Sequence, residues 1–182
     1  MAASTTSFGA PIFFWREFEH PYGFLSQWYP SAFTAPHPLP NHPPMTFLTT
    51  EQYMMYHKAM LFRDDETAVK IMAATEPRKQ KALGRKVKDF TAEVWEQNRE
   101  KIVEEGNWNK FCHAKEEEGL QQKLMKTGTR ELVEASPSDK IWGVGFNAGN
   151  AAANREKWGQ NLLGKALMRV RERIRKLEKQ QL

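Results

Sequence analysis

An acidic and a basic side chain stand seven residues apart in the segment TTEQYMMYHKAM, residues 49–60. On an α-helix, Glu51 and Lys58 share one face, two turns apart. Burial lowers the pKa of a lysine, and a neutral amine attacks carbonyl-like carbons while a nearby carboxylate moves protons. An ion pair at the rim of the core fits the same spacing and is the interpretation that spacing alone favours. His57 faces another side of this helix.

Helices are predicted for most of the chain after residue 49. The first covers residues 50–62, with Thr49 or Thr50 as its N-cap. Periodicity, caps and glycine stops predict four more, over residues 64–74, 76–84, 91–106 and 109–128. A last amphipathic helix begins near Asn161, its possible N-cap, with Leu167, Val170, Ile174 and Leu177 on the apolar face.

Strand signals are few and short. IFFWREF, residues 12–18, and TRELVEAS, residues 129–136, have the look of strands, and residues 137–150 form a glycine-rich turn region. The segment 34–45 holds five prolines and is predicted to be an exposed loop, in which His37 and His42 face solvent and bind no metal. We therefore expect a mainly α fold with a small β element: a flexible leader over residues 1–11 and one domain over residues 12–178.

Composition excludes several classes of protein. The chain has 182 residues, and its 21 aromatic side chains (11 Phe, 6 Trp and 4 Tyr) are typical of a folded domain. A single cysteine, Cys112, permits no internal disulfide and fits an intracellular compartment, cytoplasmic or nuclear. Apolar runs fall short of the roughly 18 residues of a membrane span. The net charge of +5 favours anionic partners, and the basic last helix carries much of it.

Several segments together resemble the NADAR family, also called YbiA-like, of N-glycosidases. They are YGFLSQWYPSAF, TTEQYMMYHKA, LGRKV, VWEQNREKIV, LMKTGTRELVEASPSDKIWGVG and WGQNLLGKALMRVR. They follow the family's order from about residue 12 to residue 173. The single motifs are weak, but the ordered set is specific, and it implies a single-domain YbiA-like fold.

The resemblance implies hydrolysis of an N-glycosidic bond. One substrate class of the family is ADP-ribose on guanine, whose removal reverses guanine ADP-ribosylation and belongs to DNA repair. The other is a phosphoribosyl aminopyrimidine of riboflavin biosynthesis. DNA, RNA and a free nucleotide all remain open as the natural substrate, and DNA would have to be single-stranded or have its base flipped out. We expect a monomer that needs no cofactor, no metal and no membrane.

The resemblance also assigns roles to residues. The family's acidic helix position falls on Glu51, the proposed acid/base, and its lysine on Lys58, the proposed nucleophile of a Schiff-base mechanism. Asp139 would bind ribose hydroxyls or steady Lys58. The remaining candidates would bind substrate by stacking, polar contacts or an arginine fork: Phe24, Ser26, Tyr29, Arg85, Trp95, Trp142 and Gly143.

Two interpretations of other classes stay open beside the enzyme. A non-catalytic module would bind ADP-ribose without turnover, although such a module has no need to retain Glu51, Lys58 and Asp139 together. A basic nucleic-acid-binding protein would use the net charge and the last helix, and its affinity would be sensitive to salt.

Overall fold

The structure, a computed structural model of the chain, describes residues 9–180. Most of the predicted leader, residues 1–8, lies outside the described residues. The strands are β1 (Ile12–Phe14), β2 (Phe33–Ala35), β3 (Met45–Phe47) and β4 (Leu132–Glu134). The helices are α1 (Thr50–Leu61), α2 (Asp65–Ala73), α3 (Pro77–Gly84), α4 (Ala92–His113), α5 (Leu120–Met125), α6 (Ala148–Ala151) and α7 (Leu162–Gln180). Short 3₁₀ turns add Gly23–Leu25, Glu116–Glu118 and Ala152–Lys157.

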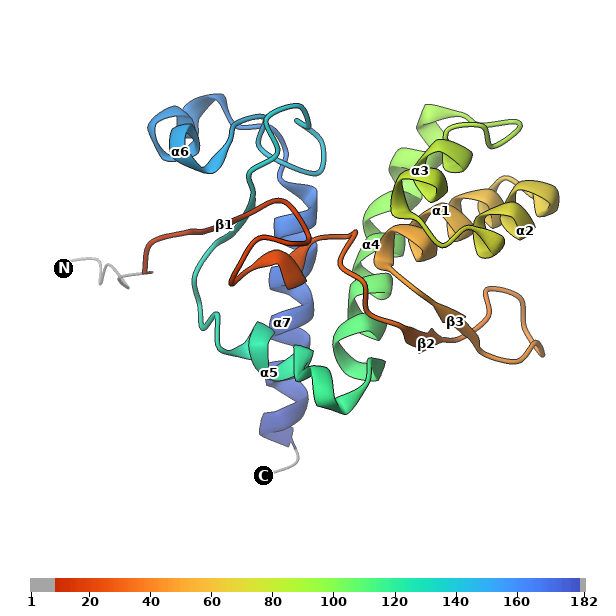
Figure 1. Cartoon of the computed structure of the whole chain (residues 1–182), viewed down its shortest axis with the longest axis horizontal. Helices are drawn as coiled ribbons and strands as arrows, with labels where there is room; N and C mark the ends of the chain where they lie inside the picture. Colours follow the sequence, from red (N-terminus) through yellow and green to blue (C-terminus); the bar gives the residue numbers. More distant parts are fainter. Residues whose placement is uncertain (1–8, 181–182) are drawn as a thin grey trace.

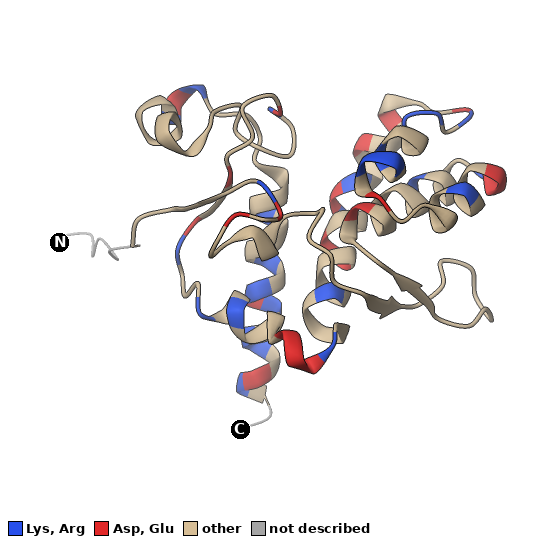
Figure 2. Ribbon diagram, viewed as in Figure 1, with Lys and Arg blue, Asp and Glu red and all other residues tan. Residues whose placement is uncertain are grey.

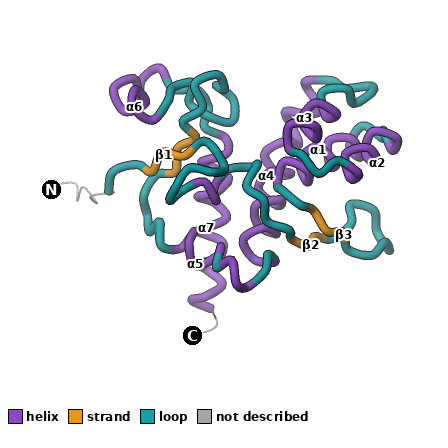
Figure 3. Tube along the Cα trace, in the orientation of Figure 1, coloured by secondary structure: helices purple, strands orange, loops and turns teal. Residues whose placement is uncertain are grey.

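Two small sheets stand apart in the fold (Figure 3). β1 and β4 pair in parallel, with Ile12 opposite Leu132, whereas β2 and β3 form an antiparallel pair. Because β1 and β4 are far apart in sequence, their pairing brings the N-terminal segment beside the loop that follows β4. The predicted mainly α fold with a small β element is confirmed.

The long helices α4 and α7 lie side by side, and α1, α2 and α3 gather on the other side of α4 (Figure 1). The apolar face of α7 contributes Leu163, Leu167, Val170 and Ile174 to the core. Leu177, predicted to continue this face, is 42% exposed because it lies past the last turn that packs on the core. Within residues 9–180, none of the helices is both long enough and apolar enough to span a bilayer.

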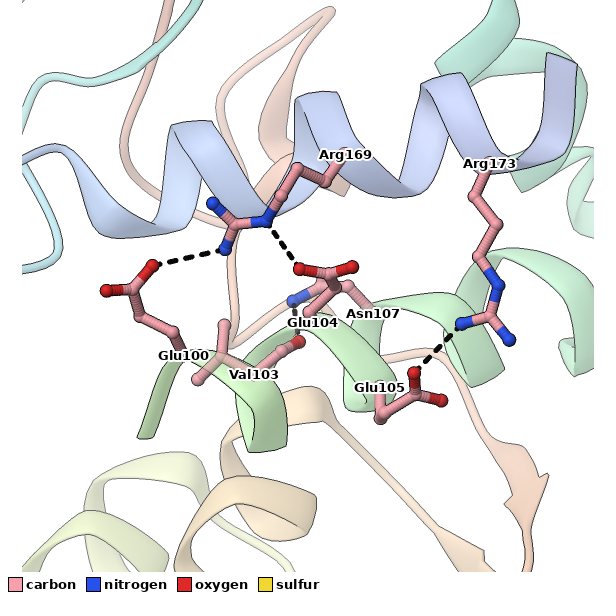
Figure 4. A network of polar contacts seen from close by, with 7 residues as sticks. All are labelled: Glu100, Val103, Glu104, Glu105, Asn107, Arg169 and Arg173. Atoms are coloured by element: carbon pink, nitrogen blue, oxygen red, sulfur yellow. Dashed lines mark hydrogen bonds and ion pairs between the residues drawn. The ribbon is translucent and has the colours of Figure 1, made fainter. Parts of the chain in front are cut away.

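Charged residues lie along both α4 and α7, and basic residues are prominent on α7 (Figure 2). Arg169 pairs with Glu100 and Glu104, and Arg173 pairs with Glu105 at 2.9 Å (Figure 4). The predicted basic face of the last helix is therefore partly neutralised by the acidic residues of α4.

Side-chain caps fix where α1 and α2 begin. The Thr49 hydroxyl accepts a hydrogen bond from the Gln52 amide at 3.0 Å, so Thr49 rather than Thr50 caps α1. Asp64 caps α2 by accepting from the Thr67 amide at 3.1 Å. The side chain of Asn161 serves β4 instead of α7. Its oxygen accepts from the Glu134 amide at 3.0 Å, and its nitrogen donates to the Leu132 carbonyl at 2.9 Å.

The predicted helices 91–106 and 109–128 were divided in the wrong place. Gly106 does not end a helix, because α4 continues through it to His113. α4 ends at His113, and Gly119, which has a φ of +57°, separates the 3₁₀ turn at Glu116–Glu118 from α5. Gly106 is there for packing: a Cβ at this position would come within 2.6 Å of the Tyr53 ring.

Residues 36–44 of the proline-rich segment connect β2 to β3 as a loop that is mostly exposed, as predicted. The ends of the predicted loop are wrong, because Thr34 and Ala35 belong to β2 and Met45 belongs to β3. The loop is anchored where His37 Nε2 lies 3.3 Å from the Tyr56 hydroxyl, so His37 is only partly exposed. His42 is exposed, and its ring lies 4.6 Å from that of His37.

Candidate functional site

One face of α1 lines a cavity of about 390 Å³. Glu51, Met54, Met55 and Lys58 all reach this cavity, as expected for positions i, i+3, i+4 and i+7 of a helix. The two methionines separate the carboxyl group from the amine along the wall. The face of α1 that carries Glu51 and Lys58, predicted from the sequence, is therefore the face that lines the cavity.

The other walls come from distant parts of the chain. The segment after β1 contributes Trp15, Arg16 and Glu17, and the segment before β2 contributes Ser26, Gln27 and Trp28. α3 and α4 supply Lys81, Gly84, Arg85 and Trp95, and β4 with its following loop supplies Glu134, Ser136, Ser138, Asp139 and Trp142. None of the residues of the proline-rich loop lines this cavity.

Glu51 is buried in the cavity wall, and the residue is 3% exposed. Its Oε1 atom has no hydrogen-bond partner among the described residues. Burial raises the pKa of Glu51 to about 7, although Lys81, the Trp28 side chain and Arg85 act in the opposite direction. A carboxyl group with a pKa near neutrality can donate or accept a proton at the pH of the cell.

Lys58 is partly buried, and its amine bonds to a backbone carbonyl rather than to Glu51, so the ion pair that spacing alone favoured is wrong. Its Nζ atom donates to the Gly84 carbonyl at 2.9 Å and lies 4.2 Å from the centre of the Phe90 ring. Burial, and secondly the charge of Arg85, lower the pKa of Lys58. This is the direction that a nucleophilic amine requires.

Asp139 is held by the backbone that follows it. Its Oδ1 atom accepts from the amides of Ile141 and Trp142, both at 2.8 Å. These bonds also fix the start of the segment that carries Trp142 into the cavity wall. Asp139 therefore has one oxygen engaged in structure, which leaves the other for a ligand.

Among the predicted binding residues, Ser26, Arg85, Trp95 and Trp142 line the cavity. Phe24 and Tyr29 do not: Phe24 packs on Phe111 in the core, with ring centroids 6.2 Å apart, and the ring of Tyr29 lies 5.3 Å from the amine of Lys110. Gly143 lies outside the cavity but against its wall, because a Cβ there would stand 2.7 Å from the Glu134 carbonyl oxygen.

Lys110 anchors the segment that places Ser26, Gln27 and Trp28 in the wall. Its fully buried amine donates to the carbonyls of Phe24, at 2.7 Å, and Ser26, at 3.0 Å. The Gln27 carbonyl in turn accepts from the Glu51 amide at 3.0 Å. The segment is thus bonded both to α4 and to the first turn of α1.

Sequence reasoning missed Glu134 and Lys81. Glu134 ends β4, and burial raises its pKa to about 8, with Asp139 and Glu51 adding to the shift and Lys81 opposing it. Glu134 lies in the matching segment LVEASPSDKIWGVG and within the strand predicted over residues 129–136, so an acid in this strand was a usable signal. Lys81 had no comparable signal, because it is one of several lysines on a basic helix.

The cavity contains the donors for an organic anion rather than a set of metal ligands. Within residues 9–180, no three His, Cys, Asp or Glu side chains are grouped in a way that could hold a metal ion. Arg16 and Arg85 are exposed at the cavity, where a guanidinium can bind a phosphate, and Trp28, Trp95 and Trp142 offer flat surfaces to a base.

Comparison with known proteins gives consistent matches. The NADAR domain model matches residues 13–175. An N-glycosidase of Acanthamoeba polyphaga mimivirus is 44% identical over 150 residues, covering 81% of this chain and 85% of that protein. An N-glycosidase of Nostoc punctiforme is 34% identical over 168 residues, covering 91% and 94%. The NMR structure of the E. coli protein YbiA shares the fold, with a TM-score of 0.69 at 24% identity over 95% of this chain and 89% of that one.

Proposed function

This chain belongs to the NADAR family, and we propose that it is an N-glycosidase that hydrolyses the bond between ADP-ribose and guanine, in DNA or in nucleosides. The observation that carries the proposal is the cavity beside α1. It combines a buried carboxyl group, Glu51, with a partly buried amine, Lys58, and the pKa of each is shifted towards neutrality. The relatives named N-glycosidase support the class of reaction.

The proposed reaction begins with attack by the neutral amine of Lys58 on the anomeric carbon of the ribose. The bond to guanine breaks, and the protonated carboxyl of Glu51 gives its proton to the leaving nitrogen. The ribose ring then opens to an imine on Lys58 after the amine has lost its extra proton. Water adds to the imine and releases ADP-ribose. Asp139 contributes by binding ribose hydroxyls or by steadying Lys58.

Substrate binding follows from the remaining groups of the cavity. Stacking on an aromatic ring is worth about 1–3 kcal/mol per base, and Trp28, Trp95 and Trp142 are the aromatic surfaces available to guanine or adenine. Arg85 is suited to the pyrophosphate, because it is exposed at the cavity and its guanidinium can bind two oxygens at once. A cavity of about 390 Å³ falls within the usual range for small-molecule sites.

The first test is turnover of a single-stranded oligonucleotide that carries ADP-ribose on one guanine. Wild-type protein is compared with Lys58→Ala and with Lys79→Ala, a matched control because Lys79 is exposed on α3 and does not line the cavity. We expect wild type and Lys79→Ala to release ADP-ribose, and Lys58→Ala to lose at least about 100-fold in rate.

Three other outcomes would contradict the proposal. Tight binding without release by wild type would identify an ADP-ribose-binding module. Release from a phosphoribosyl aminopyrimidine alone would move the assignment to the riboflavin-type substrate. Full activity of Lys58→Ala would remove the lysine from the mechanism.

A further inference from the structure

A second carboxyl group, the partly buried Glu134, lines the same cavity as Glu51. The backbone around it is fixed on both sides. The Glu134 amide donates to the Asn161 side chain at 3.0 Å, and its carbonyl accepts from the Val144 amide at 2.9 Å. Gly143 packs so closely on that carbonyl that a side chain would not fit. β4 and its neighbours therefore fix the backbone from which the side chain of Glu134 extends.

Both carboxyl groups present a shielded oxygen that has no partner. Glu51 Oε1 and Glu134 Oε2 are inaccessible to solvent and form no hydrogen bond with any described residue. A buried polar atom without a partner costs about 1–3 kcal/mol, so such atoms call for an explanation. Because both residues line the same cavity, a rotation of either carboxyl group would turn this oxygen toward a bound ligand.

The charges around Glu134 favour one shared proton. The charged side chains that line the cavity with it are Arg16 and Glu17 after β1, Glu51 and Lys58 on α1, Lys81 and Arg85 at α3, and Asp139 after β4. Two carboxyl groups in one poorly solvated site resist ionising together. Consistent with this, burial raises the pKa of Glu134 to about 8. The negative charge of Asp139 and, to a smaller extent, that of Glu51 add to the effect, while the positive charge of Lys81 opposes it.

We propose, on the basis of the N-glycosidase function above, that Glu134 is a second acid–base catalytic residue that works with Glu51 around a single shared proton. Asp139 is less suited to this role, because one of its oxygens already accepts two backbone hydrogen bonds.

The proton transfers balance over the first half of the reaction. In the reactive form Glu51 is the carboxylic acid, Glu134 the carboxylate and Lys58 the neutral amine. Because the pKa of Glu134 is the higher of the two, about 8 against about 7, this form arises when the shared proton moves from Glu134 to Glu51. As the amine bonds to the anomeric carbon and the bond to the base breaks, Glu51 gives its proton to the leaving nitrogen. Glu134 then takes the proton that the new secondary ammonium must lose. It returns this proton to the ring oxygen when the ring opens to the imine, after which water completes the hydrolysis.

The shared proton can be tested without substrate by ¹³C NMR titration of the glutamate carboxyl carbons. Wild type is compared with Glu51→Gln, Glu134→Gln and Glu178→Gln, the last an exposed control on α7. In wild type, we expect two titration steps above the ordinary glutamate range. In Glu51→Gln, the step of Glu134 should move to lower pH, because a neighbouring negative charge is gone. An unmoved step, or a Glu134 that titrates like the control residue, would overturn the proposal.

Leaving-group dependence then tests catalysis. Single-turnover rates are measured on the ADP-ribosylated guanine oligonucleotide and on ADP-ribose that carries p-nitrophenol at the anomeric carbon, a leaving group that needs no proton. Glu51→Gln should lose about 10²–10⁴-fold with guanine and much less with p-nitrophenol. Glu134→Gln should lose about 10²–10⁴-fold with both, since the amine must be deprotonated in each case.

The two proposals fail in different ways. If wild type releases ADP-ribose and Glu134→Gln does so at the same rate, the role of Glu134 is wrong and the N-glycosidase function stands. If wild type cleaves neither substrate, the proposed function is wrong, and the role of Glu134 in it falls as well.

Discussion

Burial of Glu51 makes the stability of the protein depend on pH. The pKa of this carboxyl rises from 4.5 to about 7 on folding, so between these values the folded state holds a proton that the unfolded state has lost. The free energy of unfolding therefore falls as pH rises through this window, by about 1.4 kcal/mol for each pH unit. Glu51→Gln removes this pH-dependent contribution to the free energy of unfolding, because the amide of glutamine does not titrate.

We expect Glu51→Gln to be more stable than wild type at pH 7 and close to wild type at pH 4.5. The measurement is urea unfolding of both proteins across this range, with Glu178→Gln as the exposed control. A stability difference that does not change between pH 4.5 and pH 7 would mean that Glu51 ionises normally in the folded protein.

At the scale of residues, sequence reasoning identified the cavity groups that share one local element. Glu51 and Lys58 were found because both lie on one helix, whose periodicity is visible in the sequence. Phe24 and Tyr29 were chosen only as aromatic residues near a matching segment, and they face the core and Lys110 instead. Glu134 was missed because its burial depends on Asn161 and Gly143, which contact it from later in the chain.

At the scale of elements, the close packing of α1 against α4 depends on Gly106. Replacing glycine by alanine inside a helix normally stabilises it by about 1 kcal/mol. Here the added Cβ would stand 2.6 Å from the ring of Tyr53, which is itself stacked on His57 with ring centroids 4.0 Å apart. Overpacking costs about 1–3 kcal/mol, so it outweighs the gain in helix propensity.

Gly106→Ala should therefore lower the free energy of unfolding by about 1–2 kcal/mol. Gln97→Ala, at an exposed position of the same helix, should leave it within about 0.5 kcal/mol of wild type. Denaturant unfolding of the three proteins measures both values. An increase in the stability of Gly106→Ala would show that the contact with Tyr53 does not limit packing.

Helix starts could be predicted from local chemistry, as the caps Thr49 and Asp64 demonstrate. The end of α4 could not, because a glycine that stops a helix and one that permits close packing look alike in sequence. Gly106 belongs to the second kind, and only its contact with Tyr53, from a distant helix, distinguishes it.

At the scale of the whole molecule, apolar packing rather than the ion pairs of Figure 4 holds α7 to the rest of the fold. Arg169 is 41% exposed, and exposed ion pairs are worth at most about 1 kcal/mol. Leu167 is fully buried, and truncation of a buried leucine costs about 2–5 kcal/mol.

Arg169→Ala should thus lower the free energy of unfolding by less than about 1 kcal/mol, and by less again in 1 M salt. Leu167→Ala should lower it by about 2–5 kcal/mol at either ionic strength. Urea unfolding at low and high salt distinguishes the two contributions. A loss for Arg169→Ala as large as that for Leu167→Ala would contradict this assignment.

The fold class and the family could both be predicted from the sequence, because short local segments, in their order along the chain, indicate them. The match of the NADAR domain model over residues 13–175 confirms the family. The parallel pairing of β1 with β4 could not be predicted, because each strand is three residues long and its partner is about 120 residues away. That pairing brings Glu134 and Asp139 to the cavity that one face of α1 lines.

The most direct test of the central claim is to trap the proposed imine on Lys58. Wild-type protein is mixed with the ADP-ribosylated guanine oligonucleotide in the presence of borohydride, and the modified peptide is located by mass spectrometry. Lys58→Ala and Lys79→Ala are treated in the same way. The mechanism predicts a substrate-dependent, reduced adduct on Lys58 in wild type and in Lys79→Ala, and none in Lys58→Ala. Turnover without any adduct, or an adduct on another lysine such as Lys81, would contradict it.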